Sequence, residues 1–367
     1  MRLLEINVVC GVKSTGRIAT EIAKEYENKG YEVKIAYGRD SAPSEYEKYA
    51  VRIGNKADVY YHALSSRVFD NAGFLSKRAT RGFLKWADEY NPDVLWLHNL
   101  HGYYINIPML FEWIKSRPEM KVKWTLHDCW AFTGHCTHFT LVGCDKWKTG
   151  CDKCPNKREY PSSLFLDRSK ENYYRKKELF CGINNLTLYT PSEWLKSKAE
   201  MSFLNGYDIE VRPNTIDKSI FKYTESNIRD RYNIPKDNKL IISVASAWTK
   251  AKGLDDIIEL SQRLDSDKYT IMVVGLSKKQ QRGLPKSIIG LGMVDVKELV
   301  NYYSAADLLV SASKEETFGL TILEAAACGT KSIVYKDTAC EEVALNNDGL
   351  VVDQDIESMC RAITDEI

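Results

Sequence analysis

The stretch "LLEINVVCGVKSTGRIATEIAKEYENKGYEVKIAY" (3–37) contains the unit from which the chain is built. The apolar run 3–9 predicts a buried strand, and a loop with two glycines, "CGVKSTGR" (10–17), follows it. Residues 17–29 place apolar side chains on one stripe, which predicts a helix that ends at a glycine. The segment "YEVKIAY" (31–37) predicts a second strand. This strand–helix–strand order is typical of a parallel sheet.

The same alternation continues along the chain. Helical patterns separate further predicted strands at 93–99, 122–128, 186–192 and 209–214, and then at 239–247, 269–275, 286–292, 307–313, 331–335 and 350–352. A polar, charged stretch (217–239) lies between the two series of strands. We therefore expect an α/β protein of two Rossmann-like parallel-sheet domains, 1–216 and 217–367.

Composition restricts the class of function. The 367 residues carry a formal net charge of +1, which argues against a protein that binds nucleic acid over its whole surface. No run of about 18 apolar residues is present, and the N-terminal stretch does not have the pattern of a signal peptide. We expect a cytoplasmic protein that binds no nucleic acid.

Ligands of parallel sheets bind beyond the carboxyl ends of the strands. In the first half, the segments that follow strands include "WLHNLHGYYIN" (96–106) and "LHD" (126–128). Asn99, His101 and Asn106 are candidates to bind hydroxyl groups, whereas His98 could be a core histidine. The glycine loop 10–17 suits a phosphate but fits an ordinary tight turn equally well.

The segment "KEETFGLTILEAAACG" (314–329) joins a predicted strand end to a helix that begins near Phe318 and ends at Gly329. Glu316 precedes this helix, and Glu324 lies eight residues further on. The pair could be an N-cap acid and a surface glutamate. The apolar residues around Glu324 instead favour an acid that has a partner.

This segment resembles the E-x7-E signature of the family-4 retaining glycosyltransferases, which have the GT-B fold. Other segments resemble that family in the same order along nearly the whole chain: 14–33, "LHD" (126–128), "TPSEWL" (190–195), "RPNTIDKSIF" (212–221), "SAWTKAKGLDDI" (246–257) and 290–313. The resemblance implies two domains that face a cleft. The first would lie on the acceptor side, and the second would bind a nucleotide sugar.

The resemblance also implies roles for single residues on the donor side. Glu324 would bind the ribose hydroxyls, Glu316 would hold the donor sugar, and Lys252 would neutralise the leaving phosphate. The amides of the helix start would face the sugar and diphosphate. The remaining expected donor-binding residues are Gly16, Ser246, Lys250, Val294, Phe318, Gly319 and Leu320.

One position departs from the family pattern. Ser246 stands where the family usually has an arginine, so Lys250 or another cation would have to replace that charge. Glu316, Lys252 and His127 are the expected catalytic residues, with His127 lining the reacting sugar. Asn99, His101 and Asp128 are expected on the acceptor side.

The reaction that the resemblance implies is transfer of a sugar, with retention of configuration, from a UDP- or GDP-sugar to a glycan or lipid-linked acceptor in polysaccharide biosynthesis. No catalytic metal is expected, because the Asp-x-Asp segment "DSD" (265–267) falls in a helix-to-strand turn. A nucleotide-sugar 2-epimerase of the same fold and a zinc-containing nucleic-acid-binding protein are the alternatives.

Four cysteines follow "LHD" closely. Their spacing, Cys136-x7-Cys144-x6-Cys151-x2-Cys154, suits a closed structural zinc site in an insertion at 129–155. Some polysaccharide glycosyltransferases resemble this pattern. Substitute ligands could come from Cys129, His135 and His138, and free thiols or disulfides are the alternative.

Two stretches, 67–86 and 172–180, mix basic and aromatic residues. They could rest on an anionic membrane at the inner face, or they could be ordinary helices with aromatic core stripes. The chain ends at "CRAITDEI", earlier than family members usually end, which leaves a shortened C-terminus as one interpretation.

Overall fold

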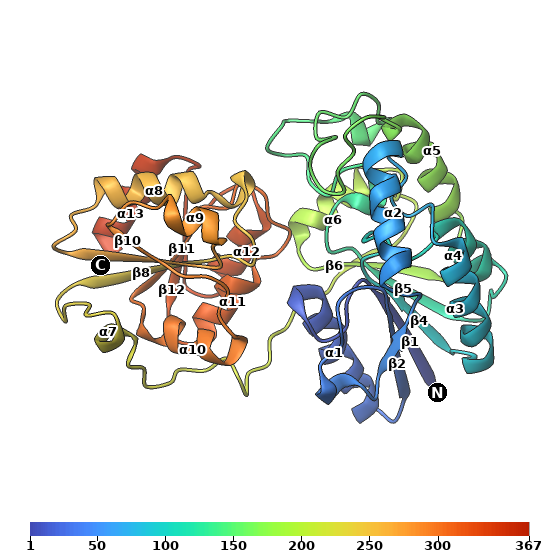
Figure 1. Ribbon diagram of the computed structural model, residues 1–367, viewed down its shortest axis with the longest axis horizontal. Coiled ribbons are helices and arrows are strands. Elements are labelled where there is room, and N and C mark those ends of the chain that lie inside the picture. Colours follow the sequence, from blue (N-terminus) through green and yellow to red (C-terminus); the bar gives the residue numbers. More distant parts are fainter. Residues whose placement is uncertain (367) are drawn as a thin grey trace. The chain divides into compact units, whose positions relative to one another are not determined.

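The computed structural model describes residues 1–366, which fold into two compact units that meet in the chain between Thr215 and Ile216 (Figure 1). Each unit is a parallel sheet with helices packed on it, as the alternating sequence pattern predicts.

The first unit contains a seven-stranded sheet in the order β3-β2-β1-β4-β5-β6-β7, with every neighbouring pair parallel. Its strands are β1 (Arg2–Asn7), β2 (Glu32–Tyr37), β3 (Ala50–Arg52), β4 (Val94–Leu97), β5 (Lys121–Thr125), β6 (Leu186–Thr190) and β7 (Ile209–Val211). Its α-helices are α1 (Lys13–Asn28), α2 (Lys56–Phe69), α3 (Lys77–Tyr90), α4 (Ile107–Lys115), α5 (Ser169–Phe180) and α6 (Glu193–Glu200).

The second unit contains a six-stranded parallel sheet in the order β10-β9-β8-β11-β12-β13. Its strands are β8 (Lys239–Val244), β9 (Tyr269–Val274), β10 (Ile288–Gly290), β11 (Leu308–Ser311), β12 (Lys331–Tyr335) and β13 (Leu350–Val352). Its α-helices are α7 (Ile228–Arg231), α8 (Leu254–Arg263), α9 (Lys278–Arg282), α10 (Val296–Ala305), α11 (Leu320–Ala327), α12 (Ala339–Leu345) and α13 (Ile356–Glu366).

Both sheets are buried on two faces, which explains why their strands are nearly continuous apolar runs. All four residues of β4 are buried, and so are five of the six residues of β1. One of those five is Glu5, a charged residue type in the middle of an apolar strand. Such a residue requires polar partners, and these belong to the site described below.

The order of the strands determines where a ligand can bind. In each sheet the winding direction reverses next to the first strand, between β1 and β4 in one unit and between β8 and β11 in the other. Loops that leave the carboxyl ends of two such strands diverge and open a crevice. The predicted site residues after β4 and β5 and those after β8 and β11 lie at these edges.

One predicted boundary is wrong in a way that concerns the site. The sequence predicted a helix that begins at residue 17, but α1 begins at Lys13. Gly16 therefore lies in the first turn of the helix, and not in the loop before it. The amide groups at the helix start belong to residues nearer to Gly11, which has a φ of +70°.

Candidate active site

In the second unit, the side chains of Lys252 and Glu316 form a direct ion pair. Lys252 ends the short 3-10 turn after β8, and Glu316 lies in the loop between β11 and α11. Burial alone would lower the pKa of Lys252, but the neighbouring Glu316 carboxylate outweighs this effect and raises it. Lys252 is therefore a permanent cation at the carboxyl edge of the sheet, beside an acceptor of hydrogen bonds.

A glycine brings these two loops together. Gly253 adopts a φ of +71°, and a Cβ at this position would lie 2.1 Å from the carbonyl oxygen of Ala312. The amide of Lys314 also donates a hydrogen bond of 2.8 Å to the carbonyl of Ala251. The Lys-Gly sequence thus places the lysine against the loop that carries Glu316 because only glycine allows this close approach.

Glu324 lies on α11 and is only 2% exposed. The hydroxyl of Tyr303, on α10, donates a 3.1 Å hydrogen bond to Glu324 Oε2. The burial excludes the interpretation of Glu324 as a surface glutamate. A buried carboxylate next to a tyrosine hydroxyl is suited to bind further hydroxyl groups.

The start of α11 lies between the two glutamates. Gly319 is its N-cap, with a φ of +95°, and no side chain caps the helix. The backbone carbonyl of Glu316 accepts a 3.2 Å hydrogen bond from the amide of Ala339, which holds the preceding loop in place. Phe318 and Gly319 are buried, and Leu320 opens the helix, so the first-turn amides can interact with a negatively charged group.

The other predicted donor-side residues have less defined surroundings. Ser246 and Lys250 are exposed in the loop that follows β8. Val294 is half-buried and packs against the core of the second unit, just before α10. Lys250 is in the same 3-10 turn as Lys252, two positions before it, and is a cation available near the position of the missing arginine.

In the first unit, a small pocket at the ends of β4 and β5 is lined by four residues that the sequence predicted, Asn99, His101, His127 and Asp128, together with His98, Leu100, Trp124, Thr125, Leu126, Trp130 and Ala131. The strands β4 and β5 are neighbours, which explains why two segments almost 30 residues apart share one pocket. Gly16 is not among the lining residues.

Asp128 and His101 form a tight pair on one side of this pocket. His101 Nε2 lies 2.6 Å from Asp128 Oδ2, and the hydroxyl of Tyr160 lies 3.2 Å from His101 Nδ1. Burial alone would raise the pKa of Asp128, but His101 outweighs this effect and lowers it to about 2. The amide of Trp130 also donates 2.8 Å to Asp128 Oδ1. Asp128 is therefore a carboxylate at every physiological pH.

His127 lies in a second polar chain, which the sequence did not reveal. Its Nε2 lies 3.0 Å from His98 Nδ1, and His98 Nε2 lies 2.9 Å from Glu5 Oε2. His98 is buried, as the core interpretation expected, but it is also the middle member of this chain. The sequence does contain one indication of these hydrogen bonds, because Glu5 is an acidic residue within an apolar strand and must have polar partners.

Asn106 was predicted as a candidate to bind hydroxyl groups, and this prediction is wrong. Its side chain caps α4, where Oδ1 accepts a 3.1 Å hydrogen bond from the amide of Met109. Its Nδ2 donates a 2.7 Å hydrogen bond to the carbonyl of Phe74, and Asn106 is buried. Asn106 therefore has a structural role.

The predicted metal ligands lie in the segment between β5 and α5. The thiols of Cys136 and Cys154 hydrogen bond to each other, and this contact lowers the pKa of Cys154 to about 7. Cys151 Sγ accepts a 3.2 Å hydrogen bond from the amide of Gly134. Within residues 1–366, no group of three or more histidine, cysteine or acidic residues is arranged to hold a metal ion. In this arrangement the four thiols do not form a zinc site, so zinc binding by this segment stays a prediction.

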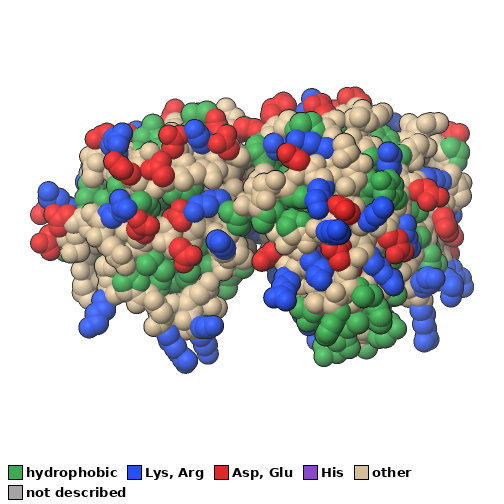
Figure 2. Space-filling model, turned by 90° about the horizontal axis from the view of Figure 1, so that it is seen from above, with side chains coloured by type: hydrophobic (Ala, Val, Ile, Leu, Met, Phe, Trp, Pro, Cys, Tyr) green, Lys and Arg blue, Asp and Glu red, His purple; other side chains and the backbone are tan. Residues whose placement is uncertain are grey.

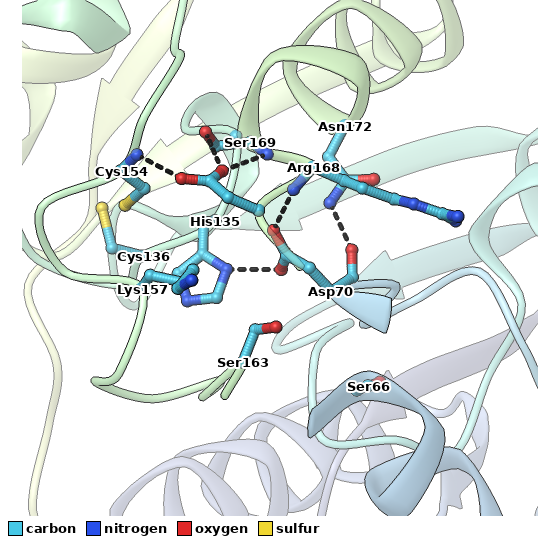
Figure 3. Close-up of polar contacts among 12 residues, drawn as sticks. Ser66, Asp70, His135, Cys136, Cys154, Lys157, Ser163, Arg168, Ser169 and Asn172 are labelled. Atoms are coloured by element: carbon cyan, nitrogen blue, oxygen red, sulfur yellow. Dashed lines mark hydrogen bonds and ion pairs between the residues drawn. The ribbon is translucent and has the colours of Figure 1, made fainter. Parts of the chain in front are cut away.

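A buried hydrogen bond between His135 and Asp70 fastens this segment to the rest of the unit (Figure 3). His135 Nδ1 lies 2.5 Å from Asp70 Oδ1, just after α2, and the amide of Arg168 donates 2.8 Å to Asp70 Oδ2. The side chain of Asn172 donates 2.7 Å to the backbone carbonyl of Asp70. His135 thus has a firm partner in Asp70 and holds the cysteine-rich segment against α2 and α5.

Comparisons with known proteins agree with this architecture. Residues 224–366 match the family described as glycosyl transferases group 1. The chain is 24% identical, over 97% of its length and 88% of the other protein, to an Escherichia coli K12 protein named as a colanic acid biosynthesis glycosyl transferase, WcaC.

Two solved structures are similar over almost the whole chain. Sucrose-phosphate synthase from Thermosynechococcus elongatus matches with a TM-score of 0.71 at 15% identity. The match covers 99% of this chain and 89% of the synthase chain. HepE of Anabaena, solved in complex with UDP and glucose, matches with a TM-score of 0.65 at 14% identity. The match covers 100% of this chain and 89% of the HepE chain.

The fold, together with the family match, defines a glycosyltransferase with the GT-B fold. Its second unit is a group 1 glycosyltransferase domain, and the whole chain is a homologue of the E. coli protein WcaC. The predicted fold class and the assignment to the glycosyltransferases are confirmed, whereas the cysteine-rich type and the retaining reaction stay predictions. Neither the epimerase nor the nucleic-acid-binding alternative receives support from these similarities.

Proposed function

We propose that the protein transfers a sugar, with retention of configuration, from a nucleoside diphosphate sugar to a glycan or lipid-linked acceptor in polysaccharide biosynthesis. The observation that carries the proposal is the Lys252–Glu316 pair at the carboxyl edge of the second sheet, followed by buried Glu324 on α11. These three side chains match the chemistry of a donor, which offers phosphates and hydroxyl groups.

Each donor-side residue has a separate task. Glu324 binds the ribose hydroxyls, and Glu316 binds hydroxyl groups of the transferred sugar. Lys252 stabilises the negative charge that grows on the diphosphate as the glycosidic bond breaks, and the amides at the start of α11 add to this. The raised pKa of Lys252 supports this role, because only the protonated amine can stabilise the negative charge on the diphosphate.

Retention follows if the acceptor hydroxyl attacks the face from which the diphosphate leaves. The departing phosphate oxygen then takes the proton of the hydroxyl, so the reaction needs no dedicated base. The protein contributes positioning and charge stabilisation. Neither step uses a metal ion, and the Asp-x-Asp segment 265–267 is exposed in the turn between α8 and β9.

We propose that polar side chains around the small pocket of the first unit bind hydroxyl groups of the acceptor. Asp128 offers carboxylate oxygens and Asn99 offers an amide, while His101, held between Asp128 and Tyr160, fixes the orientation of the carboxylate. Such a set of donors and acceptors binds hydroxyl groups with directional hydrogen bonds. The E. coli relative named for colanic acid biosynthesis and the HepE structure with UDP and glucose support a glycan product and a uridine nucleotide, respectively.

We also propose a structural zinc ion in the cysteine-rich segment. Cys136 and Cys154 are already in contact, and the charges of Cys151 and Cys136 act on Lys176. Lys176 is fully buried and donates to the carbonyls of Trp130 and Thr133, at 2.8 and 3.1 Å. Burial lowers the pKa of Lys176 to about 7, and its protonated form beside these thiols would compensate part of the negative charge of a zinc–thiolate centre.

None of the helices in residues 1–366 has the length and apolar character that a membrane-spanning segment requires. In the basic-aromatic stretch 67–86, Phe74, Phe83 and Leu84 are buried, whereas Phe69 is exposed. In the stretch 172–180, Tyr173 and Phe180 are buried as well. These five buried residues pack inward, as the interpretation of ordinary helices with core stripes expects.

A group of exposed apolar side chains lies on α2 and the loop beside it. Its residues, which we call the α2 patch, are Tyr60, Tyr61, Leu64, Phe69, Leu164, Phe165 and Leu166. Two hydrogen bonds hold the loop to the helix, from the amide of Leu164 to the carbonyl of Arg67 at 2.7 Å and from that of Leu166 to Val68 at 3.2 Å.

Figure 2 shows hydrophobic side chains gathered at one edge of the first unit with lysine and arginine side chains around them. Lys56 and Arg67 on α2, together with Arg158, are exposed cations of this region. Apolar and basic side chains together favour an anionic membrane surface. We propose that the α2 patch rests on the inner face of the cytoplasmic membrane, where a lipid-linked acceptor would be presented.

The test of the proposed transfer is a two-step screen. Thermal unfolding with UDP, GDP and other nucleoside diphosphates identifies the base by the increase in melting temperature. The matching nucleotide sugars are then incubated with lipid-linked or soluble glycans, and transfer is followed by mass spectrometry. The proposal expects one base to stabilise the protein and one of its sugars to be transferred. A protein that no nucleotide stabilises would contradict it.

A further inference from the structure

A second ion pair joins the two loops that carry Lys252 and Glu316. Lys314 Nζ lies 2.9 Å from Asp256 Oδ1. Asp256 lies in the first turn of α8, four positions after Lys252. Lys314 lies two positions before Glu316. We call the Asp256–Lys314 contact the support pair and the Lys252–Glu316 contact the donor pair.

The other carboxylate oxygen of Asp256 has a partner in the core. The hydroxyl of Tyr335, the last residue of β12, donates a 2.8 Å hydrogen bond to Asp256 Oδ2. Tyr335 is 0% exposed, so its hydroxyl has a fixed position in the second unit. Asp256 follows β8, and Lys314 follows β11, the strand between β8 and β12. One carboxylate thus connects the segments at the carboxyl ends of three neighbouring strands.

Backbone contacts join the same two loops. The amide of Lys314 donates its 2.8 Å hydrogen bond to the carbonyl of Ala251, and Gly253 packs against the carbonyl of Ala312. The side chain of Lys314 therefore leaves a backbone that is itself bonded to the Lys252 loop. Loss of the support pair would leave this backbone hydrogen bond without the side-chain contact beside it.

The order of the charges favours a single register of the two loops. Each loop carries one lysine and one acid, and each lysine meets the acid of the other loop. A shift that exchanged the partners would place Lys252 beside Lys314, and the two acids would face each other. Like charges at such distances repel. The charge order therefore favours the one arrangement in which Lys252 contacts Glu316.

The two ion pairs differ in their relation to the proposed donor. A bound diphosphate competes with Glu316 for the ammonium group of Lys252, and a sugar hydroxyl competes for the carboxylate. The donor pair is therefore weakened at the moment when its two side chains must keep their positions. The support pair has no assigned role in binding the donor, so it can hold the loops throughout the reaction.

We propose that Asp256 and Lys314 are positioning residues for the transfer reaction: their ion pair, held by Tyr335, keeps the loop of Lys252 in place against the loop of Glu316 while the donor binds. They act through Lys252. This inference rests on the proposed glycosyl transfer for its catalytic meaning. The rigidity of the two loops is a property of the folded protein and can be measured without a substrate.

Hydrogen exchange measures this rigidity directly. Lys314→Met removes the ammonium group and keeps an unbranched side chain, whereas Lys314→Arg keeps a cation that can donate to Asp256. Without nucleotide, peptides that cover 246–253 and 312–319 should exchange faster in Lys314→Met than in the wild type. Lys314→Arg should stay close to the wild type. Unchanged exchange of both peptides in Lys314→Met would overturn the proposal.

Lys331→Met is the matched control for the loss of a lysine ion pair in the second unit. Lys331 begins β12, at the opposite edge of the sheet, and its Nζ lies 2.6 Å from Glu366 Oε1. This variant should leave the exchange of both peptides and the kinetics unchanged. Faster exchange of the same peptides in Lys331→Met would show that any lost ion pair loosens them, which would overturn a specific role of the support pair.

Kinetics give the second readout. Lys314→Met should lower kcat about tenfold, because Lys252 is no longer held where charge grows on the diphosphate. The affinity for UDP or GDP should change little, since Glu324 lies on a different element. Lys314→Arg should recover most of the lost kcat. Equal kcat for the wild type and Lys314→Met would overturn the positioning role.

A double-mutant cycle separates positioning from general structural support. If Lys314 acts through Lys252, Lys314→Met should reduce kcat little further in the Lys252→Ala background. Additive losses would overturn the proposal. If Lys314→Met does not fold, Asp256→Asn, which keeps one acceptor oxygen, replaces it in each measurement. Absence of any transfer by the wild type would instead contradict the proposed function, and the exchange result would stand separately.

Discussion

Lys252 and Glu316 form an ion pair although they are 64 residues apart in the sequence. Their loops leave two adjacent strands, β8 and β11, between which the winding of the sheet reverses. The pair holds a cation and a hydrogen-bond acceptor side by side before any substrate is bound. A diphosphate and a sugar hydroxyl would each find a partner already in place, which lowers the cost of organising the site.

Replacement of the cation tests this arrangement. Lys252→Ala should reduce kcat by roughly 10²-fold or more, because the charge on the diphosphate grows in the transition state and loses its partner. The fold should persist, since the pair is half-buried and at the edge of the sheet. Steady-state kinetics with the identified donor measures the effect.

Lys268→Ala is the matched control for removal of a lysine from the same unit. Its side chain is 74% exposed, and its nearest acid, Asp265, is 3.9 Å away. This variant should have wild-type kinetics. Near-normal turnover by Lys252→Ala would show that another cation stabilises the leaving group.

Replacement of Glu324 tests nucleotide binding separately from the rate of sugar transfer. Glu324→Ala should weaken the binding of UDP or GDP by roughly 1.5–3 kcal/mol, since a buried charged acceptor of the ribose hydroxyls is lost. Calorimetric titration with each nucleotide measures this change. Tyr303→Phe controls for the loss of the 3.1 Å hydrogen bond to Glu324, because it keeps the carboxylate. An unchanged affinity in a folded Glu324→Ala protein would exclude the ribose role.

His62 gives a prediction about pH and stability. Burial lowers the pKa of His62 to about 4, and its Nε2 accepts a 3.2 Å hydrogen bond from the amide of Gly73. The unfolded chain takes up this proton near pH 6.5, so between pH 6.5 and 4 it binds more protons than the folded state. This residue should therefore make the protein less stable as the pH falls through that range, by up to roughly 3 kcal/mol.

The measurement is the free energy of unfolding in urea at pH 7, 6, 5 and 4.5, for the wild type and for His62→Gln. The variant should lose less stability on acidification, since glutamine does not titrate. The two proteins should have parallel pH profiles if His62 does not contribute, and that result would refute the prediction.

Elemental analysis tests the zinc proposal. The purified protein should contain one zinc ion per chain, and replacement of Cys151 and Cys154 by serine should remove it. A chelator should loosen residues 129–155 before the rest, which hydrogen exchange would detect, because metal binding is coupled to local folding. Nucleotide binding should survive. Metal-free protein with full transferase activity, or disulfides among the four cysteines, would refute the proposal.

The α2 patch predicts binding to anionic vesicles. The wild type should sediment with vesicles that contain phosphatidylglycerol more than with neutral ones, and Tyr61→Ser with Leu64→Ser should reduce binding. The control is Tyr174→Ser with Leu345→Ser, whose side chains are 51% and 58% exposed and outside the patch. Equal sedimentation of both double variants and the wild type would contradict a docking role for the patch.

Much of the fold could be predicted from the sequence because parallel strands buried on both faces leave a strong apolar signal. The loop residues after these strands could be predicted for the same reason. Glu316, Glu324 and Lys252 lie in short segments that resemble motifs of a known family, which is how the sequence singled them out, and the structure places Lys252 in contact with Glu316.

The remaining features depend on contacts between distant segments. Glu5 meets His98 across 93 positions, so a local pattern shows only an acid within an apolar strand. The error at Asn106 was avoidable, since an asparagine two positions before Pro108 is a typical helix start, and the side chain is used for the cap. The α2 patch could not be predicted, because composition does not distinguish an aromatic side chain that packs inward from one that faces solvent.

The central claim is tested most directly by ¹H NMR of the anomeric proton of the new glycosidic bond, recorded on the product of the identified donor and acceptor. The account predicts that the transferred sugar keeps the anomeric configuration that it had in the nucleotide sugar. A product with the opposite configuration, or a nucleotide sugar that is only epimerised at C2, would contradict the account.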